Sequence, residues 1–127
     1  MGKQRDPRRL DARRGEAGVR DYQAKRGDKI PERAYRRALW HVRAYPHIVR
    51  DLDSREPMDN LVRMTLQRDR VAVESALAEI PEEFRAGILD NILDDVPLER
   101  LPYAAVNTWS HWRRMFLRAV AENMHWM

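Results

Sequence analysis

The sequence lacks cysteine entirely and has only five glycines among its 127 residues. Without cysteine the chain forms neither disulfides nor thiolate metal sites, which suits a reducing compartment such as the cytoplasm. Strand-like runs of Val, Ile and Thr are also scarce. No apolar run approaches the roughly 20 residues that cross a bilayer. We therefore expect a cytoplasmic, all-α protein with no membrane contact, built as a small bundle of about four helices.

Sequence patterns for catalysis and cofactor binding are absent as well. No HExxH, GxxxxGK[ST] or GxGxxG pattern occurs, and no serine has the flanking glycines of a nucleophile elbow. The histidines at positions 41, 47, 111 and 125 do not have the spacing of a helical metal pair. Asp94 and Asp95 are more typical of a solvated helix end than of an acid/base pair. The sequence therefore predicts no enzyme, no cofactor and no metal site.

The net charge of +4 is distributed unevenly along the chain. Residues 1–29 carry +5 and residues 30–46 carry +3, whereas residues 47–96 carry −6 and residues 97–127 carry +2. Basic ends therefore flank an acidic middle. This pattern favours a protein that binds a polyanion at particular sites over a protein whose whole surface attracts polyanions.

Residues 1–29 have the composition of a disordered basic arm. Leu10, Val19 and Tyr22 stand isolated among charged side chains and are too few to form a core. Two interpretations of this arm stay open, a solvated tail that aids solubility and a segment that binds phosphates. Residues 30–127 are predicted to form one structural domain.

Residues 30–80 are predicted to form a helical hairpin. A first helix begins at Pro31 and has an apolar stripe formed by Tyr35, Ala38, Val42, Tyr45, Val49 and Leu52. Pro46 lies inside this stripe, and because the stripe continues in phase we expect a kink there. After a turn at residues 53–57, a second helix near residues 58–80 has a seam formed by Val62, Leu66, Val73, Ala76 and Ile80.

Asp69 falls in phase with the seam of the second helix. A buried carboxylate is costly unless an opposite charge accompanies it. We therefore expect a structural ion pair between Asp69 and an arginine, for which Arg36, Arg43 and Arg85 are the candidates.

Residues 81–127 are predicted to contain a third helix, an irregular connection and a long final helix. Pro81 begins the third helix, with acidic residues in its first turn. Two prolines make residues 94–106 mostly loop, with one helical turn expected at residues 98–101. The final helix should extend over residues 107–126, capped by Asn107 or Thr108.

The final helix has two opposed faces on a helical wheel. One face is apolar and consists of Trp109, Trp112, Phe116, Val120 and Met127. The other is polar and consists of Asn107, His111, Arg114, Arg118 and His125. An aromatic face that anchors the helix, backed by a stripe of hydrogen-bonding and cationic side chains, is typical of a helix that lies in a DNA groove.

Parts of the sequence resemble small phage and prophage transcriptional regulators of the RinA/ArpU type. PERAYRRALWHVRAYP at residues 31–46 is similar to that family's opening helix, and ALAEIPEEFRAGI at residues 76–88 to a later helix. TWSHWR at residues 108–113, followed by Phe-Leu and Val-Ala pairs, is similar to its terminal helix. The resemblance implies a C-terminal helix-turn-helix, similar to region four of sigma factors, within residues 81–127.

We accordingly expect a sequence-specific DNA-binding regulator of transcription, acting on phage or prophage genes and reading the major groove of duplex DNA with its C-terminal helix. Base contacts are assigned to Asn107, Ser110, His111 and Arg114, and phosphate contacts to Arg113 and Arg118, with Thr108 opening the recognition helix. The alternative interpretation is that this polar stripe merely faces solvent on an ordinary bundle helix.

Trp40 points away from the first apolar stripe and lies in line with Arg36 and Arg43. An aromatic side chain among cations can contact RNA polymerase, DNA or a second subunit, or be covered by another helix of the bundle. A second class of function also stays open. The chain can be a helical phage assembly or adaptor protein that forms a homo-oligomer through its first two helices.

Overall fold

The computed structural model describes residues 29–127 and shows an all-α fold. Its elements are α1 (Glu32–Asp53), α2 (Asn60–Ala78), α3 (Glu82–Asp94), a 3-10 turn η2 (Leu98–Arg100) and α4 (Val106–Asn123). No strand occurs within residues 29–127, so the predicted fold class is confirmed. None of these helices combines the length and apolarity needed to span a membrane. The arm predicted over residues 1–29 lies outside the described residues, apart from Lys29.

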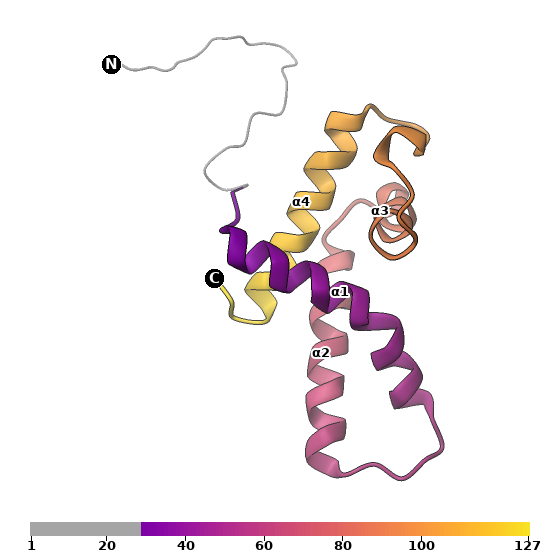
Figure 1. Cartoon of the computed structure of the whole chain (residues 1–127), viewed down its shortest axis with the longest axis vertical. Coiled ribbons are helices and arrows are strands. Elements are labelled where there is room, and N and C mark those ends of the chain that lie inside the picture. The colour runs from indigo at the N-terminus through magenta and orange to yellow at the C-terminus, as the bar shows by residue number, and fades with distance from the viewer. Residues whose placement is uncertain (1–28) are drawn as a thin grey trace, which may run out of the picture.

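Helix α4 is the element around which the others are arranged (Figure 1). It packs against α1, α2, α3 and η2. The C-terminal half of α1, the loop after it and the N-terminal half of α2 extend away from α3 and α4 as a hairpin. Residues 95–105 connect α3 to α4 and include η2, near the predicted helical turn. This connection is longer than the three or four residues of a compact helix-turn-helix.

Local sequence explains where the helices begin. Pro31 and Pro81 occupy the N-cap positions of α1 and α3, so each helix starts at the glutamate that follows. The carboxylate of Asp59 caps α2 by accepting a 3.0 Å hydrogen bond from the backbone N–H of Leu61. Helix α1 passes through Pro46 without a break, and Figure 1 shows its axis bending toward its C-terminal end.

The core lies between α4 and the other three helices. Its largest fully buried side chains are Val42, Val73, Ile88, Ile92, Trp109, Phe116, Leu117 and Val120. The indole Nε1 of Trp109 donates a 3.1 Å hydrogen bond to the carbonyl of Pro102, and its ring meets Phe84 edge-on at 4.9 Å between centroids. A Cβ at Gly87 would lie 2.5 Å from the same ring. The predicted anchoring of the final helix through Trp109 is therefore confirmed.

Helix α4 differs from the prediction at both ends. It begins at Val106, and its N-cap residue Ala105 makes no capping hydrogen bond through a side chain, so the predicted caps Asn107 and Thr108 are wrong. It ends at Asn123, three residues earlier than predicted, and the chain then turns with a φ of 61° at His125. Met127 lies beyond the helix and is 44% exposed, so it does not extend the apolar face.

Only part of each predicted apolar stripe is buried. The seam predicted for the second helix is buried at Val73 and Ala76 in α2 and at Ile80 just after α2, whereas Val62 is 49% exposed. The cause is the reach of α4, whose last residue, Asn123, donates a 3.0 Å hydrogen bond to the carbonyl of Ala72 and goes no further along α2. In α1 the buried residues are Ala34, Ala38, Val42 and Ile48, while the remaining members of its predicted stripe are half-buried.

The predicted partners of Asp69 are wrong. The Oδ1 atom of Asp69 accepts a 3.0 Å hydrogen bond from Nη2 of Arg68, its neighbour on α2. Because the Asp69 side chain is still 18% exposed, a surface arginine reaches it and no arginine from another helix is needed. The backbone carbonyl of Asp69 lies 3.0 Å from Nε2 of His41, which ties α1 to α2 at the same level. Arg85 instead donates to the carbonyl of Ile80.

Candidate nucleic-acid interface

The polar flank of α4 is where the sequence predicts base contacts. Asn107 is exposed in the first turn, and Ser110, His111 and Arg114 are half-buried along the following turns. The three- and four-residue spacing places Asn107, Ser110 and Arg114 on one side of α4. The structure thus brings these three side chains together, while the half-buried Thr108 lies about 100° further around the helix from Asn107.

Arg113 does not belong to this flank. Its Nε donates a 2.6 Å hydrogen bond to Oδ1 of Asn91 on α3, and its Nη1 donates to the hydroxyl of Tyr35 on α1. The guanidinium therefore joins three helices within the partly buried interior. The prediction that Arg113 contacts phosphates is corrected accordingly, because this arginine uses its donors inside the protein.

Arg118 is also engaged within the protein. Its Nε donates a 3.1 Å hydrogen bond to Oε2 of Glu122, one turn further along α4, and its side chain is only 23% exposed. A phosphate that approached Arg118 would meet the charge of Glu122 as well. Arg114, unlike Arg118, pairs with no acid among residues 29–127, but it is half-buried and its Nε atom is shielded from solvent.

Helix α1 presents a more basic surface than α4. Residues 33–50 contain five arginines and two histidines and no acidic residue. All five arginines are exposed, and four of them lie close together within residues 33–43, namely Arg33, Arg36, Arg37 and Arg43. Trp40 stands among them with 68% of its surface exposed. We call these four arginines and Trp40 the cationic face of α1.

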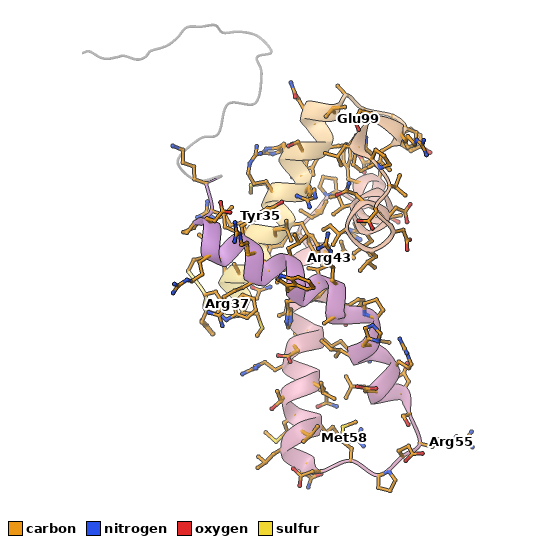
Figure 2. All side chains as sticks on the ribbon, viewed as in Figure 1. Tyr35, Arg37, Arg43, Arg55, Met58 and Glu99 are labelled. Atoms are coloured by element: carbon orange, nitrogen blue, oxygen red, sulfur yellow. The ribbon has the colours of Figure 1, made fainter. Side chains whose placement is uncertain are left out.

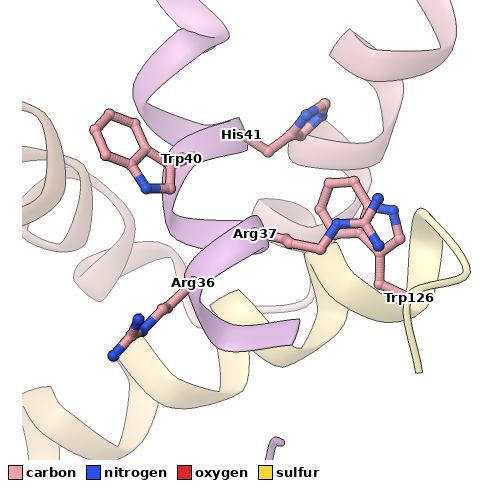
Figure 3. A pocket seen from close by; sticks show the side chains of 5 residues that line it. All are labelled: Arg36, Arg37, Trp40, His41 and Trp126. Carbon is pink, nitrogen blue, oxygen red and sulfur yellow. The ribbon is translucent and has the colours of Figure 1, made fainter. Parts of the chain in front are cut away.

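A hollow of about 380 Å³ lies over the cationic face and is lined by Arg36, Arg37, Trp40, His41 and Trp126 (Figure 3). Figure 3 shows Arg37 extending over the indole of Trp126, with its Cζ 4.3 Å from the ring centroid. Arg36 and Trp40 point to the other side of α1 in this view. Guanidinium groups beside indoles offer a phosphate its counter-charge and offer a base a stacking surface.

The contacts made by the cationic face leave its charges available. Arg36 pairs with Glu32 at 2.9 Å, but both side chains are more than 70% exposed, so the pair is weak and readily exchanged. Arg43 donates a long bond of 3.4 Å to the carbonyl of Ile92, and its Cζ lies 5.8 Å from the Trp40 ring. Figure 2 shows Arg37 and Arg43 on α1 among the side chains of the whole fold.

The titratable cluster with clearly shifted pKa values serves structure instead. The hydroxyl of Tyr45 donates a 2.7 Å hydrogen bond to Glu74, which also accepts from Arg70 at 3.0 Å. Burial, together with this bond, raises the pKa of Tyr45 to about 12. The same bond holds the pKa of Glu74 below its usual value. The cluster joins α1 to α2, and within residues 29–127 no group of three or more acids and histidines is arranged for a metal.

Sequence reasoning singled out Arg36, Trp40 and Arg43 as a partner surface and missed Arg37, His41 and Trp126. The sequence did contain a signal for Arg37, because this residue belongs to the acid-free stretch over residues 33–50. Trp126 was not predictable, since its place beside α1 depends on the turn at His125 that follows the end of α4. No protein-family model matches the chain, and no curated protein or solved structure matches it either.

Proposed function

We propose that this protein binds double-stranded DNA and regulates transcription, and that the cationic face of α1 provides its main contact with phosphates. One observation carries the proposal. Residues 33–50 place five arginines on one helix without a single acid, and the four within residues 33–43 are exposed around an exposed tryptophan. Such a concentration of one charge sign on a helix is the electrostatic footprint of polyanion binding.

The sequence on either side of this face supports the same partner. Residues 1–29, which carry +5, precede α1 in the sequence and add positive charge to the same part of the chain. The resemblance of residues 31–46 to RinA/ArpU-type regulators concerns this same helix. Together these features favour a transcription regulator of phage or prophage genes.

Sequence reading is assigned, within this proposal, to the N-terminal turns of α4. The exposed Asn107 can bond adenine N6 and N7, and Arg114 can bond guanine O6 and N7. Ser110, which lies on the same side, and His111 complete the set of proposed base contacts. The cationic face supplies affinity in this scheme, and α4 supplies the choice of sequence.

Salt dependence of DNA binding tests the proposal. Each phosphate neutralised by a Lys or Arg lowers the logarithm of the binding constant by about 0.9 for each tenfold rise in salt. If the four arginines of the cationic face each contact a phosphate, a plot of the logarithm of the binding constant against the logarithm of salt concentration has a slope of about −3.6 or steeper for a random duplex. The proposal is wrong if the protein does not slow the migration of duplex DNA in a gel at low salt. It is also wrong if the affinity for duplex DNA does not change with salt concentration.

An adaptor protein without DNA affinity is the second candidate. The observation in its favour is the hairpin of α1 and α2, where Leu61 is 73% exposed and Met64 is 63% exposed. Exposed apolar side chains on one helix are typical of a protein interaction surface. The same salt titration separates the two candidates, because an apolar surface of this kind does not bind duplex DNA.

A further inference from the structure

One side of α1 carries a line of basic side chains with a tryptophan near its middle. The members of this line follow one another at three- and four-residue intervals, so they share one side of the helix. We call this line the α1 stripe, and it consists of Arg33, Arg36, Trp40, Arg43, His47 and Arg50. All six side chains are exposed, opposite the side of α1 that is buried at Ala38 and Val42. Among residues 29–127, therefore, no helix covers the stripe.

The stripe extends the cationic face toward the C-terminal end of α1. From Arg33 to Arg50 it covers about 25 Å along the helix axis, at 1.5 Å per residue. That length matches about seven stacked nucleotides of one strand, at about 3.4 Å each. Nη2 of Arg50 donates a 2.9 Å hydrogen bond to Nδ1 of His47, so these last two members contact each other. Positive charge is thus available along the whole length of a short strand.

Trp40 stands between the arginines of the stripe and keeps 68% of its surface exposed. The Cζ atom of Arg43 lies 5.8 Å from its ring centroid, and Trp40 lines the hollow of about 380 Å³. The other indole of that hollow, Trp126, already contacts Arg37 and the ring of His41 on the far side of α1 (Figure 3). Trp40 is therefore the indole of this surface that can still stack on a ligand.

The indole in the stripe favours unpaired bases over an intact duplex. In a duplex the bases present only their edges in the grooves, because their faces are stacked on one another. A single strand exposes those faces, and proteins that bind single strands combine a positively charged track with aromatic side chains on which bases stack. A protein partner fits less well, since the centre of a protein interface is apolar and Trp40 is the only apolar member of the stripe.

We propose that the α1 stripe binds single-stranded DNA, with its arginines on the phosphates and one base stacked on Trp40. The inference rests on the proposed function, because it requires that the cationic face binds DNA. It extends that function from the closed duplex to a stretch in which the two strands have separated.

The test compares three DNA probes at one salt concentration. They are an oligothymidylate of about 12 nucleotides, a strand of the same length that lacks bases, and a duplex. The strand without bases carries the same phosphates, so its affinity reports charge alone. Fluorescence anisotropy of each labelled probe, titrated with the full chain, gives the dissociation constants. We expect the oligothymidylate to bind about fivefold or more tighter than the strand without bases.

Substitutions separate the stacking contact from the phosphate contacts. Trp40→Ala should weaken binding of the oligothymidylate about tenfold and leave the strand without bases unchanged, because only the stacking surface is removed. Trp40→Phe should recover most of this loss, since a phenyl ring also stacks on a base. Arg36→Ala should weaken both strands alike. Tyr103→Ala is the matched control, an aromatic side chain 87% exposed on the loop before α4, and it should change neither.

A second measurement does not depend on affinity. Titration with the oligothymidylate should quench the tryptophan fluorescence of the parent chain, because a base stacks on an indole. Trp40→Phe should remove most of that quenching. Circular dichroism of each variant verifies that it is folded.

The inference is overturned, while duplex binding stands, if the oligothymidylate binds no more tightly than the strand without bases. It is overturned as well if Trp40→Ala weakens both strands equally or weakens neither. A chain that binds none of the probes contradicts the proposed function itself. A chain that binds the oligothymidylate through Trp40 and does not bind the duplex contradicts the proposed function and leaves the role of Trp40 in place.

Discussion

The arginines of α1 differ from those of α4 in how far they are exposed and in what they contact. On α1, Arg33, Arg36 and Arg37 are exposed and held by weak contacts or none. On α4, Arg113 is used to join three helices and Arg118 is paired with Glu122. A basic helix in a sequence is therefore a poor guide to a binding surface until the burial of each cation is known. The helix at the centre of a bundle uses its polar side chains for assembly.

The sharpest way to break this comparison is to remove the guanidinium of Arg113. Arg113→Ala leaves Tyr35 and Asn91 without their shared donor and should cost about 3 kcal/mol of unfolding free energy. Arg113→Lys should recover only part of the loss, because an ammonium cannot reproduce the planar fork. Urea unfolding measures both variants, with Arg33→Ala as the exposed control, expected within about 0.5 kcal/mol of the parent chain.

If Arg113→Ala is as stable as Arg33→Ala, the distinction between structural and surface arginines does not hold. DNA affinity is not needed for this decision, so the result stands whether or not the proposed function is right.

The second prediction concerns the cationic face. The double variant Arg36→Glu, Arg37→Glu should bind a random duplex about a hundredfold more weakly, roughly tenfold for each reversed charge, which corresponds to about 2.7 kcal/mol. Its salt slope should fall by about 1.8, since two phosphate contacts are lost. Both side chains are exposed, so the unfolding free energy should change little.

The matched control for this variant is Arg55→Glu, Arg100→Glu. It alters the net charge equally, at two exposed arginines that lie outside the cationic face. If both double variants lose affinity alike, the loss comes from net charge, and α1 is not the site.

The third prediction asks whether α4 selects sequence. Arg114→Ala should weaken binding to the preferred site about tenfold and leave binding to a random duplex almost unchanged, because a base contact carries sequence information. The preferred site comes from selection of bound duplexes out of a random library. Equal losses on all sequences would move Arg114 from base reading to phosphate contact.

The smallest expected effect concerns Arg70, which is less exposed than the arginines of the cationic face and pairs with Glu74 at the surface. The variant that tests this pair changes Tyr45, which also bonds Glu74. The folded-state pKa of Glu74 is lowered, so the stabilisation is complete above its ordinary value of 4.5 and fades as pH falls below it. Tyr45→Phe removes the largest cause of this shift. At pH 7 it should cost less than about 1 kcal/mol, because the cluster is partly exposed.

Unfolding by urea at a series of pH values from 7 down to 3 measures this difference. The gap between Tyr45→Phe and the parent chain should narrow in acid, and a gap that widens there contradicts the assignment of the bond to an ionised Glu74.

The sequence was sufficient to predict the number of helices and the starts that prolines mark. Spacing and the positions of Pro31 and Pro81 carry that information locally. The sequence was not sufficient to predict which arginines of α4 are used inside the protein. The position of Arg113 in the sequence is compatible with a solvent-facing stripe, and only the fold brings Asn91 and Tyr35 beside it. The exposed part of the α2 seam was missed for a similar reason, since it depends on where α4 ends.

The position of α4 also sets the order in which the domain is completed during synthesis. The hydroxyl of Tyr35 accepts its hydrogen bond from Arg113, which lies 78 residues further along the chain. Helices α1 and α2 both pack against α4, which is synthesised last of the four helices. Nascent chains that have not yet released α4 therefore expose Val42 and Val73. We therefore expect chaperones that shield these intermediates to raise the yield of folded protein.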